Sequence, residues 1–190
     1  ALRELTDFRE RVADAERSRN RALLRIATGR TIARTRMPEW LVATRQDCPE
    51  LDVRITTGSL HDGVLMLSEG HADVLIAYFH PRLLLNIDSA VVDYCVLAGE
   101  TLLPFSAAHD GQPLFRLPGT LSRPLPHIRF HSTLALAKIE QEALRRPKQA
   151  FYLNSEIEID SPEAALDLCI AGMGVAWLPL SLARRALEQG

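Results

Sequence analysis

Apolar positions in the first part of the chain alternate between strand-like and helix-like spacing. Short apolar or alternating runs indicate strands, and apolar residues three or four apart are typical of amphipathic helices. The pattern predicts a strand over 23–27, a helix over 32–47, a strand over 51–55, a helix over 60–69 and a strand over 72–79. Strands that alternate with helices favour a parallel sheet with right-handed crossovers, which is an α/β fold.

The second part of the chain is less regular but ends in the same alternation. The pattern predicts strands over 91–97 and 100–106, a proline-rich loop over 107–127, a strand over 128–130, a helix from His131–Thr133 to Arg145, extended segments over 151–153 and 156–159, a helix that starts at Asp160–Glu163, a buried strand over 175–178 and a final helix over 181–188. We therefore expect two Rossmann-like lobes, 22–96 and 97–190, with a hinge and a ligand cleft between them.

Residues 1–21 differ from both lobes. Leu2, Leu5, Phe8 and Val12 form a narrow apolar stripe in a segment otherwise rich in charge. Such a helix is marginal alone and usually docks on a partner. We interpret it as a linker or dimerisation helix.

Composition excludes several classes of protein. The net charge is −2, so the chain carries no electrostatic footprint of a nucleic-acid binder. No apolar run reaches the roughly 18 residues of a membrane helix, and no signal peptide is recognisable, so a cytoplasmic location is expected. The three cysteines, Cys48, Cys95 and Cys169, are widely spaced, as in a reduced protein without a metal site.

No catalytic motif is recognisable, and no cofactor is expected. Gly-x-Ser-x-Gly, His-Glu-x-x-His and a lysine-bearing phosphate loop are all missing from the sequence. Gly172 and Gly174 are more typical of a helix stop and a tight turn than of a phosphate loop. A binding module is therefore favoured over an enzyme.

Several segments together resemble the effector domain of LysR-type transcription regulators. The matching segments are 24–31, the Met37–Pro38 and Cys48–Pro49 steps, Gly70-His71-Ala72-Asp73 before an apolar strand, and the Ala171–Pro179 run with its paired glycines. The resemblance covers residues 22–190 and implies a bilobal fold like that of type II periplasmic binding proteins. It also implies a homodimer or homotetramer, with DNA contacted through a winged helix-turn-helix outside this chain. The closing strand and helix of the first lobe are likewise expected beyond Gly190.

The alternative interpretation is a solute-binding protein of a transport system with the same bilobal fold. The helix over 1–21 and the missing signal peptide argue against it. Residues 72–115 further resemble the hypochlorite-responsive branch of the regulator family, through Tyr78-Phe79-His80 and His109-Asp110-Gly111.

The candidate effector-binding residues lie where strands end and helices begin, the edge at which α/β sheets hold ligands. They are Thr28, Arg30, Thr31, Thr57, Tyr78, Phe79, His80, Phe105, His131, Ser132 and Thr133. Hydroxyls, Arg30 and a helix N-terminus would favour an anion, and an oxidant acting on Met or Cys is the other hypothesis. Each residue also has a plain structural interpretation, as a helix cap, a core side chain or a solvated group.

Overall fold

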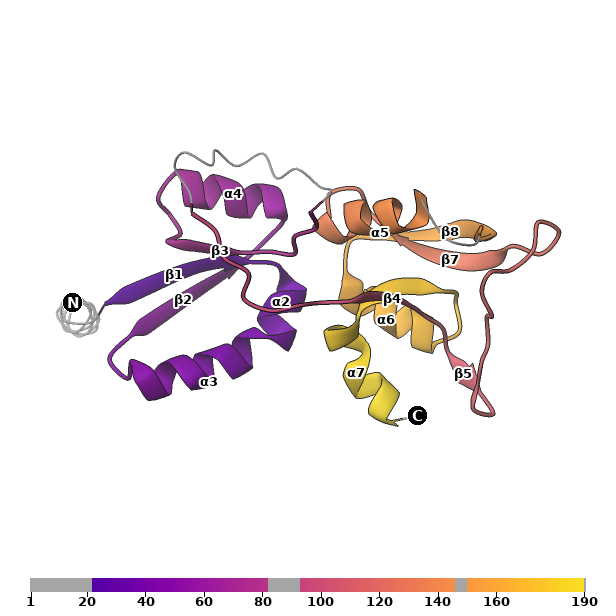
Figure 1. The fold of residues 1–190 in the computed structure, drawn as a ribbon, viewed down its shortest axis with the longest axis horizontal. Coiled ribbons are helices and arrows are strands. Elements are labelled where there is room, and N and C mark those ends of the chain that lie inside the picture. The colour runs from indigo at the N-terminus through magenta and orange to yellow at the C-terminus, as the bar shows by residue number, and fades with distance from the viewer. Residues whose placement is uncertain (1–21, 82–92, 146–149, 190) are drawn as a thin grey trace, which may run out of the picture. The chain divides into compact units, whose positions relative to one another are not determined.

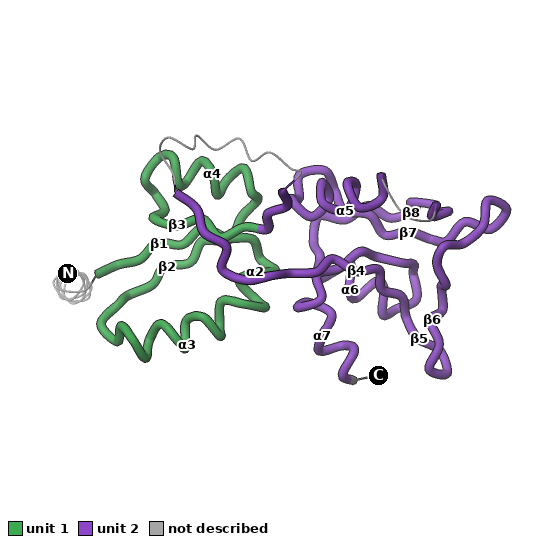
Figure 2. Tube along the Cα trace, viewed as in Figure 1, with its two compact units in different colours: residues 1–77 green, residues 78–190 purple. Residues whose placement is uncertain are grey.

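The computed structural model describes residues 22–81, 93–145 and 150–189. The helix expected over 1–21 lies outside these residues. The chain divides into two compact units, residues 1–77 and 78–190 (Figure 2). The lobes expected over 22–96 and 97–190 divide it elsewhere and remain a proposal.

Unit 1 is a three-stranded parallel sheet covered by helices on both faces (Figure 1). Its elements are β1 (Leu23–Thr28), α2 (Arg30–Thr35), α3 (Met37–Asp47), β2 (Asp52–Thr57), α4 (Leu60–Ser68) and β3 (Val74–Ile76). The strand order is β2-β1-β3, so the chain crosses over twice, once through α2 and α3 and once through α4. The predicted strand–helix–strand–helix–strand order of this unit is confirmed.

The prediction of a single helix over 32–47 is wrong, because the helix is interrupted at Arg36, between α2 and α3. The Arg36 backbone has φ −118° and ψ −38°, and α3 restarts with Pro38 in its first turn. Proline has no backbone N–H and restricts the residue before it, so it favours a helix start over a helix interior. The strand expected over 72–79 is also shorter than predicted, and Val74 is 39% exposed.

The start of α4 follows from its sequence. The Ser59 hydroxyl accepts from the Asp62 backbone N–H at 3.2 Å, and the Asp62 carboxylate accepts from the Ser59 N–H at 3.1 Å. These reciprocal bonds form a capping box. The hydrogen bonds from Ser59 also lower the pKa of Asp62.

Unit 2 joins a parallel and an antiparallel pair of strands. Its elements are β4 (Leu102–Phe105), β5 (Ala108–His109), β6 (Gln112–Pro113), β7 (Leu125–Phe130), α5 (Ala135–Arg145), β8 (Leu153–Ile159), α6 (Pro162–Ile170), β9 (Ala176–Pro179) and α7 (Leu180–Gln189). β7 pairs with β8 in parallel and β4 pairs with β9 antiparallel. The two pairs meet at a bridge between His127 and Val175.

The core of unit 2 lies between this sheet and its helices. Its buried members are Ile128, Phe130, Leu136, Ala137, Ala165, Cys169, Ala176, Leu178 and Leu182. The helix start predicted at Asp160–Glu163 is confirmed, since the Ser161 hydroxyl accepts from the Ala164 N–H and Pro162 occupies the first turn. The predicted buried strand at 175–178 is confirmed as β9, all of which is buried.

The paired glycines after α6 have the structural role predicted for them. Gly172 has φ +78° and follows the helix C-terminus. A Cβ on Gly174 would lie 2.7 Å from the Pro126 carbonyl oxygen. Glycine is therefore needed here for a left-handed turn and for the close approach to β7.

Three other predictions for unit 2 are wrong. Residues 93–97 form no strand, and the loop expected over 107–127 contains the β5–β6 hairpin and the start of β7. The hairpin turns at Asp110 and Gly111, which both have positive φ, and this turn signal is embedded in a proline-rich stretch. α5 starts at Ala135 and not at His131–Thr133, because a turn closed by the Leu134 N–H on the His131 carbonyl comes first.

Candidate functional site

Unit 2 contains a cavity of about 340 Å³ lined by both polar and apolar side chains. The volume is within the range of small-molecule sites. All of the lining residues belong to unit 2, and they are Tyr78, Phe79, His80, Glu100, Thr101, Leu102, Leu136, Ile139, Glu142, Ala143 and Pro179. We call this cavity the Tyr78–Pro179 pocket.

The apolar part of the pocket comes mainly from one face of α5. Leu136, Ile139 and Ala143 recur at spacings of three and four, so they form one stripe along the helix. The Phe79 ring, 52% exposed, borders the pocket and lies 6.3 Å from the Tyr94 ring in a tilted arrangement. This part of the lining suits the apolar body of a ligand.

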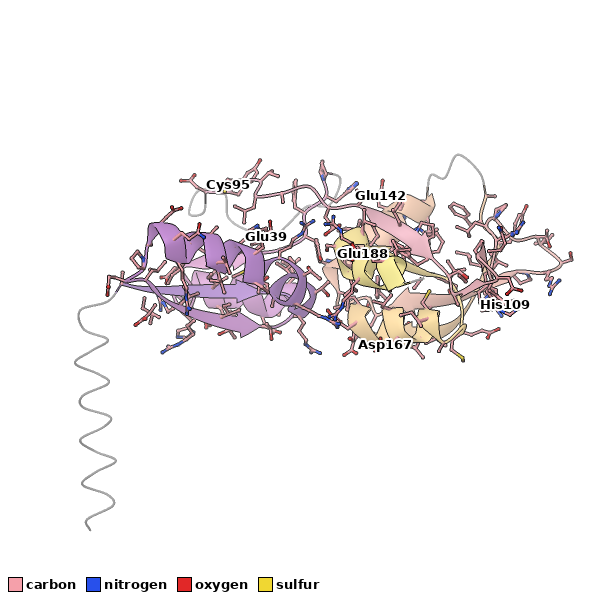
Figure 3. The ribbon with its side chains drawn as sticks, turned by 90° about the horizontal axis from the view of Figure 1, so that it is seen from below. Glu39, Cys95, His109, Glu142, Asp167 and Glu188 are labelled. Atoms are coloured by element: carbon pink, nitrogen blue, oxygen red, sulfur yellow. The ribbon has the colours of Figure 1, made fainter. Side chains whose placement is uncertain are left out.

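The polar part of the pocket includes His80, Glu100 and Glu142, of which Glu142 is labelled in Figure 3. Glu100 is held in place by its neighbours, because its Oε1 accepts from the backbone N–H of Thr101 at 3.0 Å and of Ser181 at 3.3 Å. The carboxylate thereby connects the start of β4 to the start of α7. Ligand sites typically have a small number of polar groups in fixed positions beside an apolar surface.

Three of the candidate residues, Tyr78, Phe79 and His80, are thus brought together in this pocket. The sequence-based reasoning missed Glu100 and Glu142. Glu100 is the first residue of the predicted strand over 100–106, but Glu142 becomes a pocket residue only through the position of α5. No signal in the sequence pointed to Glu142.

In unit 1 the strand ends bring other candidates to one sheet edge. Thr28 and Thr57 are register partners at the ends of β1 and β2, and Arg30 opens α2. The Thr28 hydroxyl donates to the Ile76 carbonyl at 2.8 Å, and both Thr28 and Thr31 are buried. Arg30 and Thr57 are exposed, so they are the side chains of this group available to a ligand.

The N-terminal cap of the helix at this edge is not the one that the sequence predicted. The N-cap of α2 is Gly29, and no side chain caps the helix. α2 has only six residues. The edge therefore offers Arg30 and Thr57 side chains and not a long helix dipole.

The remaining candidates, in unit 2, do not line the pocket. His131 Nδ1 lies 2.9 Å from Thr133 Oγ1, and Ser132 is exposed in the same turn. The Phe105 ring packs on the core, while the Ser106 hydroxyl accepts from the Phe115 N–H at 3.0 Å. Phe105 and Ser106 thus have internal contacts.

The cysteines differ in accessibility. Cys48 and Cys95 are exposed, and Cys95 lies in the extended segment before β4 (Figure 3). Cys169 is buried and donates to the Phe105 carbonyl at 3.1 Å. Burial raises the pKa of the Cys169 thiol, which disfavours the reactive thiolate.

Two classes of site are not found among the residues that the structure describes. In 22–81, 93–145 and 150–189, no group of three His, Cys, Asp or Glu side chains is arranged to hold a metal ion. None of the helices in these ranges combines the length and apolarity needed to cross a membrane.

Solved structures of similar fold include transcription regulators. DarR from Vibrio fischeri, described in complex with DNA, is 18% identical with a TM-score of 0.72, over 99% of this chain and 61% of its own. The bromide-bound regulatory domain of HypT from Salmonella typhimurium is 20% identical with a TM-score of 0.68, over 88% of this chain and 75% of its own. The effector-binding domain of QuiR with shikimate is 14% identical with a TM-score of 0.65, over 87% and 78%. At these identities the likeness concerns the fold.

The present chain therefore spans about 61% of the length of the DarR chain. No curated protein matches the sequence. The family model of the LysR substrate binding domain matches residues 17–190. On that match, which extends over most of the sequence, the chain belongs to the LysR substrate-binding domain family.

Proposed function

We propose that this chain is the effector-sensing domain of a LysR-type transcription regulator and that its effector binds in the Tyr78–Pro179 pocket. The observation that carries the proposal is the pocket itself, in which Tyr78, Phe79 and His80 meet polar and apolar groups from β4, α5 and β9. The family match supports a regulator and does not favour the transport alternative.

The lining indicates the kind of molecule that would fit. The stripe of Leu136, Ile139 and Ala143 offers dispersion contacts and apolar burial, and the Phe79 ring offers a flat wall. His80 and Glu100 would orient a polar head. The effector is then a small molecule with an apolar body and one polar end.

An anionic group would have a different place. Arg30 and Thr57 at the sheet edge of unit 1 combine a guanidinium and a hydroxyl, which suit a carboxylate or an inorganic anion. Thr28 and Thr31 are not included, because both side chains are buried. His131, Ser132 and Thr133 remain candidate contacts of the second unit.

Oxidant sensing, as in the hypochlorite-responsive branch, is a finer proposal that concerns the methionines. Met173 is 49% exposed, whereas Met37 is 2% exposed. Exposed methionine is the more readily oxidised, so Met173 is the methionine to examine. Peptide mass spectrometry after hypochlorite treatment tests this, and the branch assignment fails if Met173 is not oxidised before the other methionines.

The whole regulator would act as a homodimer or homotetramer in the cytoplasm. A winged helix-turn-helix elsewhere in the protein would contact DNA, and the effector would change the geometry of the lobes and so of the oligomer. This transmission requires that the effector bind the two geometries with different affinity.

The pocket is tested by a ligand screen with a matched set of probes. Benzylamine, benzoate and benzyl alcohol share one apolar body and differ in the charge of the head, and thermal unfolding of the chain reports binding of each. At least one should raise the Tm of the wild type and not of Phe79→Ala. Leu121→Ala, at an 84% exposed position outside the pocket lining, is the control and should respond like the wild type.

The outcomes separate the two sites. A benzoate response that survives Phe79→Ala but is lost in Arg30→Ala would move the proposed site to unit 1. Responses that survive both variants would contradict the proposal.

A further inference from the structure

Three side chains outside the pocket form a continuous hydrogen-bonded row in unit 2. Glu140 Oε1 lies 2.8 Å from His127 Nε2, and His127 Nδ1 lies 2.8 Å from Ser155 Oγ. The three residues come from α5, β7 and β8. A hydroxyl, an imidazole and a carboxylate in this order are the arrangement that activates a serine nucleophile.

The row runs from the interior of unit 2 to its surface. The His127 and Glu140 side chains are only 5% and 4% exposed, whereas Ser155 is exposed. The imidazole and the Trp177 ring pack at 86° to one another, with centroids 5.4 Å apart. The base is thus shielded from water and the hydroxyl stands at the solvent end.

The hydrogen-bonding chemistry sets the direction of the row. Both oxygens of Glu140 act as acceptors, since Oε2 also faces the backbone N–H of Phe130 at 3.5 Å. In the tautomer that would activate the serine, His127 Nε2 carries the hydrogen and donates it to Glu140. In the neutral imidazole Nδ1 is then the acceptor, and the Ser155 hydroxyl donates to it.

The strand pairing is irregular at this point. His127 is paired with Ser155 and Ile128 with Ile157, so Glu156 has no partner in the register of β7 and β8. Such bulges re-aim the backbone and are frequent beside reactive residues. The backbone N–H of the residue after a nucleophilic serine is also a common donor to a developing oxyanion.

A second hydroxyl–imidazole–carboxylate row, formed by Thr133, His131 and Glu158, provides a comparison. Beyond the end of β7, His131 Nδ1 lies 2.9 Å from Thr133 Oγ1, but its Nε2 is 3.7 Å from Glu158. Glu158 also pairs with Arg129, and His131 is 46% exposed. This open row has the same groups without the close carboxylate bond or the shielding.

We propose that Ser155 is a nucleophilic serine, with His127 as its general base and Glu140 as the positioning residue, and that small activated esters and organophosphorus compounds modify it. In the reaction Ser155 Oγ forms a bond to the electrophilic carbon or phosphorus, and its proton passes to His127 Nδ1. The bond to the leaving group breaks, and the leaving group takes up that proton. The product is a stoichiometric ester of Ser155, and the inference is independent of the effector pocket.

The test is labelling of the chain with a fluorophosphonate probe, followed by intact-mass measurement and peptide mapping. We expect a single adduct on Ser155, formed about 100-fold faster than any on Ser122, because general-base assistance contributes on the order of 10²–10⁴. Ser122 is an exposed serine whose nearest side-chain partner is the Thr120 hydroxyl, at 3.4 Å. Ser155→Ala should lose the adduct and Ser122→Ala should keep it.

Glu140→Gln distinguishes positioning from a structural role. It should lower the first-order labelling rate at saturating probe, while the probe concentration for half-maximal rate and the near-UV circular dichroism stay unchanged. Absence of a Ser155 adduct in the folded wild type would overturn the proposal, as would equal labelling of Ser122 or Thr133. The wild-type map alone decides the matter even if the Glu140 variant does not fold.

Discussion

Each unit contains a carboxylate that is bonded to a basic side chain of another element, and the two pairs differ mainly in their access to water. In unit 1, Arg25 of β1 donates from Nη2 and Nε to the two oxygens of Asp73, just before β3, at 2.6 and 3.1 Å. The side chains are 35% and 37% exposed. In unit 2, His127 and Glu140 meet at 2.8 Å and are almost fully buried.

Exposure to water determines how much stability is lost when one partner of such a pair is removed. The Asp73 carboxylate also accepts from the Arg25 backbone N–H at 2.8 Å, and these hydrogen bonds lower its pKa to about 2. Water can replace much of this interaction if a partner is lost. Water does not reach the buried pair as easily, so each of its two groups depends on the other for a hydrogen-bond partner.

The largest expected effect is that of Glu140→Leu. The variant leaves His127 Nε2 and the Phe130 N–H without their carboxylate, so we expect the free energy of unfolding to fall by about 3–5 kcal/mol. Urea unfolding followed by tryptophan fluorescence measures it. A loss below about 1 kcal/mol would mean that the pair is not an anchor of α5.

Replacing both partners of the buried pair should lower the free energy of unfolding less than replacing Glu140 alone. In the double variant His127→Leu, Glu140→Leu neither polar side chain of the pair is left without its partner in the interior, and apolar residues often substitute for a buried pair at little cost. We expect the double variant to regain most of the stability lost by Glu140→Leu. A double-mutant cycle gives the coupling, and strictly additive losses would contradict it.

Asp73→Asn should have a smaller and pH-dependent effect. Because the folded pKa of Asp73 lies below its usual 3.8, its stabilisation is present above that value and is lost as the pH falls toward about 2. Unfolding at pH 6, 4 and 3 should therefore show a gap between wild type and variant that closes with acid. A gap that widens at low pH would contradict the assignment.

Added salt should produce the smallest change in the free energy of unfolding. Raising NaCl from about 0.05 M to about 1 M shortens the Debye length to roughly 3 Å, so it should narrow the difference between wild type and Asp73→Asn. The destabilisation by Glu140→Leu should not respond, because ions do not enter the core. If salt changed the destabilisation of both variants equally, the distinction between an exposed Arg25–Asp73 pair and a buried His127–Glu140 pair would be contradicted.

The sequence was most informative where a local signal decided the structure. The parallel unit 1, the start of α6 at Ser161–Pro162 and the turn at Gly172–Gly174 all follow from caps, prolines, glycines and periodicity. The break at Arg36 was also signalled, by Pro38, although the apolar periodicity concealed it.

The sites depend on tertiary geometry and were only partly predictable. Tyr78–His80 could be found because they end a strand, but Glu142 enters the pocket only through the rotation of α5. His127, Glu140 and Ser155 are separated by 13 and 15 positions, and they meet only because the register of β7 and β8 pairs His127 with Ser155 and α5 packs beside them. No sequence motif encodes that register.

The central claim is that a small effector occupies the Tyr78–Pro179 pocket, and a crystal structure of the chain with the probe that most raises its Tm tests it most directly. We expect electron density for the probe between the Phe79 ring and the Leu136–Ala143 face of α5, with its polar end toward Glu100 or His80. Density at Arg30 and Thr57 with an empty pocket would contradict it.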